Sequence, residues 1–393
     1  MAEKFKKFIP FGEPKISPQE IKEMVKTLKT GWLGAGPKVS AFEEAFKRYV
    51  HARQALAVSS CTAALHLSLI AAGIKPGDEV ITTPLTYAAT ANVIFQVGAK
   101  PVFADVARET YNLDPQEIRK KITPKTKAII PVHFGGLPAD LTEINKIAQK
   151  HQLRVIEDAA HAIGARYQGK MIGDSQNYVC FSFYPNKNIT TGEGGIIVTS
   201  NRRPMGRLKI LRANGVSREA WKRYHEKQFL PGLVMEPGYK YNLTDLQATL
   251  GLEQLKKVEE WLRIRERYAK IYDYYFQKIP GIYLQYRPKG WPGNRHSLHF
   301  YTLRLEPKKF IISRDLILAK LNQMNIGAVV QYIPLHLHPF YQKKYHCKKG
   351  DFPVAELIAD HIFTLPLTPH LKEKEIRGIG QRVSRLLENN RKN

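Results

Sequence analysis

A single lysine, Lys187, stands between a strand-like run and a glycine cluster in the segment FSFYPNKNITTGEGG, residues 181–195. The amine of a lysine becomes a nucleophile when its surroundings lower its pKa. The chain holds 61 lysines and arginines, so counting alone favours a solvated surface charge at any one of them. The glycines allow a close backbone approach, but they follow the lysine, so the segment is not a Walker-type phosphate loop. The chemistry of Lys187 therefore depends on the side chains that the fold brings beside it.

Other polar groups come directly after strand-like runs, where open parallel sheets bind their ligands. After the run ALAV, Cys61 and Thr62 follow two serines at the start of a helical pattern. Such a start can bind a phosphate, or it can be a plain N-cap. After VITTP, Tyr87 can stack on a flat ring or simply pack, and Ser182 follows the run YVCF. Each of these signals is weak when taken alone.

A carboxylate, Asp158, follows the run RVIE, and His161 comes three residues later. A carboxylate at a strand end costs free energy unless it meets a cation or hydrogen-bond donors. A metal pair is conceivable, but no third ligand with suitable spacing is nearby. A cation other than a metal ion, or a set of hydrogen-bond donors, is therefore the expected partner of Asp158.

Together these residue types match the requirements of pyridoxal 5′-phosphate (PLP). This cofactor needs a lysine for a Schiff base, a carboxylate at its pyridine nitrogen, an aromatic ring for stacking and a helix start for its phosphate. The carboxylate raises the pKa of the pyridinium, which keeps the ring an electron sink. The convergence of several weak signals on one cofactor predicts a PLP site.

With these residues in place, the chain resembles the DegT/DnrJ/EryC1/StrS family of PLP-dependent sugar aminotransferases, which have fold type I. The resemblance extends over nearly the whole chain through the ordered motifs GWLGAGPKVSAFEEAF, SSCTAAL, GDEVITTPLTYAATAN, EDAAHAIGARYQGKMIG, FSFYPNKNITTGEGG and GYKYNLTDLQATLG. The segments GYKYNLTD, PVHFGGLPAD and KNIT followed by EGG are most similar to the branch that makes UDP-4-amino-4-deoxy-L-arabinose, the sugar later attached to lipid A.

The resemblance implies a role for each residue at the ring of the cofactor. Lys187 is then the lysine that forms the Schiff base, and Asp158 is the partner of the pyridine nitrogen. His161 hydrogen-bonds the ring hydroxyl, and Tyr87 stacks on the ring. Lysine at position 187 argues against a dehydratase, because family members with that activity carry histidine there.

The resemblance also implies which residues bind the phosphate of PLP. Cys61, Thr62 and Ser182 bind it from the same chain, and Asn242 reaches the phosphate of the neighbouring subunit in a homodimer. Many relatives carry asparagine before the motif tyrosine and arginine after it, where this chain has Lys240 and Asn242, so either residue can make that contact. Cys61 also departs from a position often held by glycine.

The implied reaction moves an amino group from glutamate, which leaves as 2-oxoglutarate, to a UDP- or dTDP-linked keto-sugar at C3 or C4. Trp32 in GWLGAGP and His336 in QYIPLHLHPFY are candidate substrate contacts, although clustered histidines can also simply pack. Two alternatives stay open: a PLP-dependent sugar dehydratase of the same fold, and a basic regulator that binds nucleic acid.

Alternating strand-like and helical patterns must position these residues. After a helix at residues 17–30, seven strand-like runs between residues 55 and 200 are separated by helical patterns, which predicts a largely parallel sheet with helices on both faces. A helical pattern of over thirty residues from Thr244 is expected to bridge two domains. Strand-like runs at 299–306 and 328–334 and two closing helical segments follow it.

These patterns predict an α/β protein of fold type I, like aspartate aminotransferase. Residues 1–258 are expected to form an N-terminal segment and a large PLP-binding domain with a mostly parallel sheet. Residues 259–393 are expected to form a smaller α+β domain. A chain of 393 residues is long enough for two such cores.

Composition restricts the remaining function classes. Three scattered cysteines support neither a disulfide framework nor a zinc site, and no run is apolar enough for a signal peptide or a membrane span, so a cytoplasmic enzyme is expected. The formal net charge of +26 raises nucleic acid as a partner. The basic residues are spread along the chain, which favours a basic surface for anionic small molecules, with no nucleic acid bound.

Overall fold

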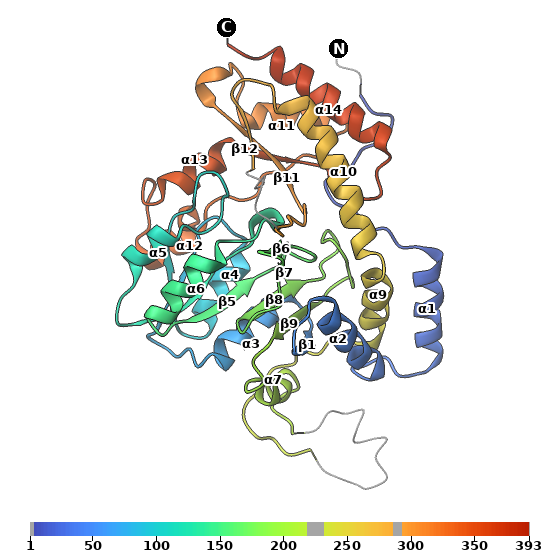
Figure 1. Ribbon diagram of the computed structural model, residues 1–393, viewed down its shortest axis with the longest axis vertical. Helices are drawn as coiled ribbons and strands as arrows, with labels where there is room; N and C mark the ends of the chain where they lie inside the picture. The colour runs from blue at the N-terminus through green and yellow to red at the C-terminus, as the bar shows by residue number, and fades with distance from the viewer. Residues whose placement is uncertain (1–3, 218–231, 286–292, 393) are drawn as a thin grey trace.

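The computed structural model describes residues 4–217, 232–285 and 293–392, and its largest feature is a seven-stranded sheet (Figure 1). In the order β1-β9-β8-β5-β4-β2-β3, β9 runs antiparallel to both of its neighbours and the other pairs are parallel. The strands are β1 (Gln54–Val58), β2 (Glu79–Thr82), β3 (Lys100–Phe103), β4 (Thr126–Ile130), β5 (Arg154–Asp158), β8 (Tyr178–Ser182) and β9 (Gly195–Thr199). The predicted largely parallel sheet is confirmed.

Helices cover both faces of this sheet, because successive strand residues point to opposite sides. In β1, Ala55 and Ala57 join the core on one face, and Leu56 and Val58 join the core on the other. The first face carries α2 (Pro37–Tyr49), α5 (Pro115–Lys121) and α6 (Leu141–Lys150), and the second carries α3 (Cys61–Ala71), α4 (Ala88–Gln96) and α7 (Met205–Arg212). Because both faces are covered, every residue of strands β2, β8 and β9 is buried.

The long helical pattern is two helices rather than one. α9 (Asp245–Leu255) lies against α2 and against α1 (Pro18–Lys29), whereas α10 (Val258–Phe276) lies against α14 (Glu373–Glu388). The break falls where the Lys257 ammonium is held at the start of α1, 2.9 Å from the Ser17 hydroxyl and 3.0 Å from the Glu20 carboxylate. α10 extends from the large sheet toward the C-terminal helices (Figure 1). Its role as a bridge between two domains stays a prediction.

A smaller antiparallel sheet packs with the C-terminal helices. Its order is β10 (Ile282–Leu284), β11 (Tyr301–Leu305) and β12 (Ile362–Leu365). The helices of this part are α10, α11 (Arg314–Gln323), α12 (Pro339–Tyr345), α13 (Pro353–His361) and α14. A short hairpin of β6 (Arg166–Tyr167) and β7 (Lys170–Met171) and three 3₁₀ turns (Phe134–Gly136, Pro307–Lys309 and Leu335–Leu337) complete the described elements.

The predicted strand at residues 328–334 is wrong. Only Val329 pairs, through a single bridge to Thr364, and the strand beside β11 is β12. Val330 and Tyr332 pack instead against a core that contains Phe134 and Phe300. The sequence of a short apolar run does not distinguish a strand that pairs in a sheet from a segment that packs between two cores.

The segment before α1 belongs to the core of the smaller sheet. Ile9 is buried in the cluster that contains residues of β11, α11 and α14, and it pairs with Ile326. Residues near 15 then reach α9, where the Gln254 amide donates to the Lys15 carbonyl at 3.2 Å. The expected domain boundary after residue 258 stays a prediction.

Gly195, the last glycine of GEGG, explains how β9 approaches the start of α3. A Cβ atom at this position would lie 2.4 Å from the Ser60 carbonyl carbon and 2.5 Å from the Cys61 nitrogen. Both contacts are with backbone, which cannot move aside easily. The absence of a side chain therefore brings β9 against the helix start that was predicted to bind phosphate.

We expect Gly195→Ala to lower the free energy of unfolding by about 1–3 kcal/mol through this overlap. Gly206→Ala is the matched control, because Gly206 lies in α7 with no atom within 4 Å of the added Cβ. Alanine there should change stability by less than about 1 kcal/mol, in the stabilising direction. Urea unfolding of both variants measures the difference, and equal stability of the two variants would contradict the packing argument.

Candidate active site

The predicted site residues meet at one edge of the large sheet. β5 ends at Asp158 and β8 ends at Ser182, while β1 leads into α3 at Cys61. Because parallel strands end at the same edge, three separate sequence motifs arrive together. Lys187 lies close enough to Asp158 for the charge of this carboxylate to act on its amine.

Asp158 is buried and hydrogen-bonded on both oxygens. Thr90 Oγ1 donates to Oδ2 at 2.8 Å, and the Ala160 N–H donates to Oδ1 at 3.2 Å. Thr90 is fully buried, and its hydroxyl lies 2.8 Å from that of Thr86. Burial nevertheless raises the pKa of Asp158, although these donors and the nearby Lys187 oppose the shift. The carboxylate would thus be stabilised by a further cationic partner.

Lys187 carries an amine of lowered pKa. Its side chain is half-buried, and burial lowers its pKa to about 8 despite the opposing attraction of Cys61 and Asp158. Within the described residues, neither a hydrogen bond nor an ion pair reaches its ammonium nitrogen. A half-buried amine of this kind is suited to nucleophilic and proton-transfer chemistry at neutral pH.

Several buried polar atoms around Lys187 have no partner within the described residues. They belong to the two flanking asparagines and to two stacked histidines whose rings lie 4.7 Å apart. The atoms are Asn186 Oδ1, Asn188 Oδ1, His161 Nδ1 and both ring nitrogens of His299. Leaving a buried polar atom unpaired costs about 1–3 kcal/mol, so this arrangement fits a polar ligand such as the PLP ring.

The two histidines are strongly desolvated. Burial lowers the pKa of His161 and of His299 well below its usual range, and the charge of Lys187 adds to both shifts. His161 Nε2 lies 3.2 Å from the Tyr332 hydroxyl. A neutral His161 can therefore use its free Nδ1 toward a ligand while Nε2 stays engaged with Tyr332.

The expected phosphate end lies at the start of α3. Ser60 Oγ accepts a hydrogen bond from the Ala63 N–H, so this serine is an N-cap. The N–H groups of Cys61 and Thr62 belong to the first helical turn, which has no intrahelical acceptor for them. Burial raises the pKa of the Cys61 thiol well above its usual range, so Cys61 contributes a neutral thiol and an N–H group.

Tyr87 and Ser182 differ in their exposure. Tyr87 precedes α4 and is 65% exposed, and its ring centroid lies 6.2 Å from that of the half-buried Tyr332. An exposed aromatic ring of this kind leaves a free face for a ligand. Ser182 Oγ accepts a hydrogen bond from the Tyr184 N–H at 3.3 Å and is buried.

Asn242 and Lys240 differ in their surroundings. Asn242 pairs with Val58, just before the helix start that is expected to bind phosphate, and its side-chain oxygen is buried without a partner among the described residues. Lys240 is exposed and pairs through its backbone with Ala213. Which of the two residues reaches the neighbouring subunit stays a prediction.

The two candidate substrate contacts lie outside this cluster. Trp32 is half-buried, and its indole N–H donates to the Ala35 carbonyl at 3.2 Å. His336 is fully buried, 2.8 Å from the Glu356 carboxylate, and packs on Phe352. The surroundings of His336 favour a packing role, because Glu356 holds its Nε2 and Phe352 packs against its ring.

Sequence reasoning missed Thr90, His299 and Tyr332. Thr90 lies in the first turn of α4, and its hydroxyl meets that of Thr86, which precedes the helix, so no helical spacing reveals the pair in the sequence. His299 and Tyr332 follow from no local signal. They come from segments more than one hundred residues after Asp158 and reach it only through the packing of the two cores.

Comparison with known proteins identifies the chain. A model of the DegT/DnrJ/EryC1/StrS aminotransferase family matches residues 14–384. The chain belongs to this family. The spore coat polysaccharide biosynthesis protein SpsC of Bacillus subtilis is 44% identical over 384 residues, which cover 98% of each chain.

Solved structures of DegT/DnrJ/EryC1/StrS aminotransferases superpose on this one. The putative sugar aminotransferase Spr1654 from Streptococcus pneumoniae, in its PMP form, is 31% identical with a TM-score of 0.90, covering 97% of this chain and 99% of its own. PseC of Helicobacter pylori, an aminotransferase involved in the biosynthesis of pseudoaminic acid, is 30% identical with a TM-score of 0.88, covering 98% and 100%. The predicted fold type I and the predicted cofactor, PLP, are confirmed.

This family member is thus a PLP-dependent aminotransferase, and its structural neighbours act on sugars. In the part of the chain that the structure describes, no helix has both the length and the apolar character to cross a membrane. The same residues contain no cluster of three or more His, Cys, Asp or Glu side chains suited to a metal ion. The cytoplasmic location stays a prediction.

The lowered pKa of Lys187 predicts its reactivity in the cofactor-free protein. Because the pKa in the folded protein is about 8, the neutral fraction rises through half at that pH. A lysine of ordinary pKa is about one part in three hundred neutral there. Limited acetylation across about pH 6–10, read by peptide mass spectrometry with Lys278 as reagent reference, should give a midpoint near 8 at Lys187. A reactivity that still rises steeply at the top of this range would contradict the shift.

Proposed function

We propose that the enzyme transfers an amino group from glutamate to the keto carbon, C4, of a UDP-linked sugar. The observation that carries the proposal is the half-buried amine of Lys187 near the buried carboxylate of Asp158. Several buried polar atoms of the neighbouring residues have no partner among the described residues. The family match and the sugar aminotransferases among the solved structures support a sugar as the acceptor.

The residues at the sheet edge fit the parts of PLP. Asp158 would pair with the pyridine nitrogen, the unpaired His161 Nδ1 would be available to the ring hydroxyl, and the exposed Tyr87 would stack on the ring. Cys61, Thr62 and Ser182 would hold the phosphate, through N–H groups at the start of α3 and a serine hydroxyl. When bound, PLP supplies an electron sink for the bonds at the carbon that carries the amino group.

Lys187 supplies proton transfer. Its neutral amine takes the proton from Cα of glutamate, and its ammonium returns a proton to the sugar carbon that receives the amino group. A pKa of about 8 lets both forms occur near neutral pH. Asp158, held by Thr90 and Ala160, keeps a negative charge at the far end of the same site.

A homodimer would complete the site with Asn242 from the neighbouring subunit. An exposed apolar stripe on α1 supports an interface, since Ile21, Val25 and Leu28 recur at helical spacing and are 55%, 43% and 50% exposed. Leu33 extends this stripe and is 43% exposed. The net charge of +26 would attract the diphosphate of a sugar nucleotide.

One relative, SpsC, supports a polysaccharide precursor as the product. SpsC is named for spore coat polysaccharide biosynthesis and shares 44% of its residues with this chain. The motifs that resemble the UDP-4-amino-4-deoxy-L-arabinose branch make the corresponding UDP-4-keto-pentose the first substrate to test. Of the two candidate substrate contacts, Trp32 in the loop before α2 is the one that we propose to touch the substrate. His336, which is buried against Glu356, would support the site from within the core.

The proposal is tested by incubating the purified holoenzyme with glutamate and a panel of UDP- and dTDP-linked keto-sugars. We expect 2-oxoglutarate and an aminosugar nucleotide in equal amounts, with mass spectrometry giving the product and NMR the aminated carbon. A product that has lost a hydroxyl without gaining nitrogen would support the dehydratase alternative instead.

Lys187→Ala is expected to abolish turnover and the attachment of the cofactor by borohydride. Lys278→Ala, at an exposed site in the smaller part of the molecule, is the matched control and should retain both. Amino transfer by a Lys187→Ala protein supplied with PLP would show that the assignment of this lysine is wrong.

Thr90→Val should weaken the retention of PLP by about tenfold, because Asp158 loses a buried charge-assisted hydrogen bond. Thr90→Ser keeps the hydroxyl and should retain nearly normal affinity. Absorbance titration of the cofactor-free proteins with PLP measures both dissociation constants. Equal affinities for the two variants would place Thr90 outside the support of Asp158.

A further inference from the structure

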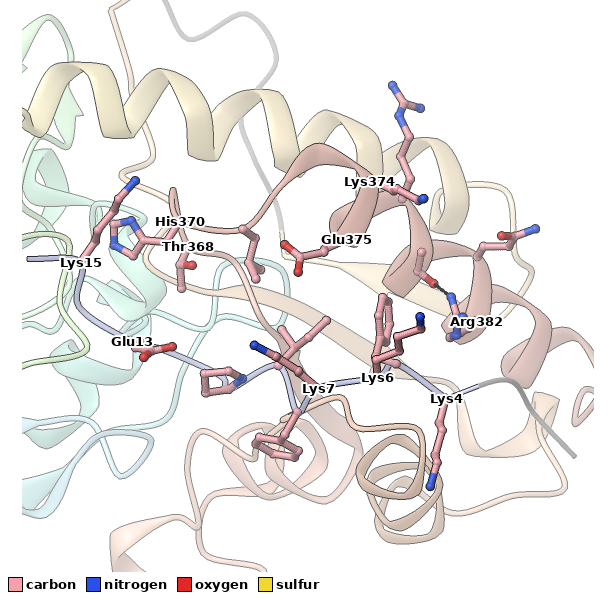
Figure 2. Close-up of a pocket in the computed structure, with 18 of the residues that line it drawn as sticks. Lys4, Lys6, Lys7, Glu13, Lys15, Thr368, His370, Lys374, Glu375 and Arg382 are labelled. Atoms are coloured by element: carbon pink, nitrogen blue, oxygen red, sulfur yellow. Dashed lines mark hydrogen bonds between the residues drawn. The ribbon is translucent and has the colours of Figure 1, made fainter. Parts of the chain in front are cut away.

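A basic groove lies between the extended segment of residues 4–15 and helix α14, away from the candidate active site. Its volume is about 1020 Å³, which is within the range of small-molecule sites. None of the candidate PLP-binding residues lines it. Figure 2 shows Lys6 and Lys7 on the extended segment facing α14, with Lys15, Thr368 and His370 at one end and Arg382 at the other.

The charge in the groove is strongly unbalanced. Seven lysines and arginines line it against two glutamates. The basic residues are Lys4, Lys6, Lys7, Lys15, Lys374, Arg377 and Arg382. Of the two acids, Glu375 Oε2 already accepts the Lys372 N–H of the α14 capping box at 2.7 Å.

The lysines of the groove are not neutralised by the protein itself. Among the described residues, no carboxylate forms an ion pair with any of its five lysines. Arg377 differs, because it is paired with Glu373 at 2.7 Å. Clustered positive charge around a concave surface of low dielectric raises the local concentration of anions.

The inner end of the groove is polar and electropositive. His370 Nδ1 is buried without a partner among the described residues, and the ring packs edge-on against Trp261 at 5.5 Å. Burial and the charges of Arg265 and Lys15 lower the pKa of His370 to about 4. Arg265 itself is buried, and its guanidinium donates to the carbonyls of Leu298 and Leu367 rather than to a carboxylate.

The walls of the groove add apolar surface. Phe5 is covered by the Arg382 guanidinium at 4.4 Å, while Phe8 is 51% exposed and lines the groove with Pro10 and Leu371. Lysine ammonium groups suit several phosphate oxygens at once, since each is a compact charge on a flexible stem. A free aromatic ring beside them suits a flat organic group.

We propose that this groove is a second ligand site that binds a nucleotide-sized organic diphosphate, with the phosphates on Lys6 and Lys7, the organic part against Phe8, and Lys15 adding positive charge from the other end of the groove. Such a site lies between α14 and the extended segment of residues 4–15. This segment joins the core of the smaller sheet at Ile9 and leads to the start of α1 after Lys15. It is independent of the proposed sugar reaction, because its ligand need not be a substrate.

The test uses ADP as the probe, at low ionic strength, with the PLP-loaded enzyme in an isothermal titration. We expect one saturable ADP site per chain, displaced by inorganic tripolyphosphate and not shared by adenosine. The triple variant Lys6→Ala/Lys7→Ala/Lys15→Ala should weaken ADP binding by about tenfold or more, because three of the unpaired charges are removed. These three residues lie outside helices and strands, and a thermal melt confirms that the variant folds.

The matched control is Lys278→Ala/Lys308→Ala/Lys349→Ala, which removes the same net charge from exposed sites outside the groove. This control should change the ADP dissociation constant by less than about twofold. The proposal is overturned if ADP does not saturate, if both triple variants weaken binding equally, or if only DNA or anionic vesicles bind through the three groove lysines. The assay needs no turnover, so failure of the sugar reaction and failure of this site give different results.

Discussion

The burial of one carboxylate at the end of β5 is the constraint on which the rest of the site depends. Asp158 is 6% exposed, and its pKa is raised because desolvation outweighs its two hydrogen bonds. The amine of Lys187 nearby is shifted in the opposite direction for the same reason. Both groups are therefore destabilised in their charged forms, and a cationic ring with a reactive aldehyde satisfies both at once.

The residue before Asp158 shows that burial alone does not make a reactive carboxylate. Glu157 points to the opposite face of β5 and is fully buried, with hydrogen bonds from His133, Ser175 and Asn177. His133 Nδ1 accepts the Ala139 N–H at 3.0 Å, so its proton is on Nε2, directed at Glu157. Glu157 is thus satisfied within the protein, whereas Asp158 and the unpaired atoms around it are arranged for a ligand.

The positive charge of the chain divides between two settings. At the sheet edge, burial lowers the pKa of the Lys187 amine to about 8, so that its neutral form becomes accessible near neutral pH. On the groove beside α14 the lysines lack carboxylate partners among the described residues, and their charge is retained at the surface. Lysine side chains therefore suit proton transfer at the sheet edge and attraction of anions in the groove. The two settings differ because Lys187 is desolvated and the groove lysines are not.

The sequence by itself determined the order of strands and helices, the largely parallel sheet and the residues that end each strand. These features follow from local periodicity and from the fact that parallel strands end at one edge, which brings Cys61, Asp158 and Ser182 together. Local pattern wrongly predicted one continuous helix where the structure has α9 and α10, and a strand at residues 328–334. In both places the chain changes its packing partner.

Only the tertiary structure decided what surrounds those residues. Thr90 beneath Asp158, His299 and Tyr332 around His161, and the burial of His336 against Glu356 depend on contacts between segments far apart in the chain. The pKa shifts of Asp158 and Lys187 likewise arise from exclusion of water, which no spacing of residues encodes. Residue types can therefore be read along the chain, but their desolvation and their partners appear only when the two cores pack together.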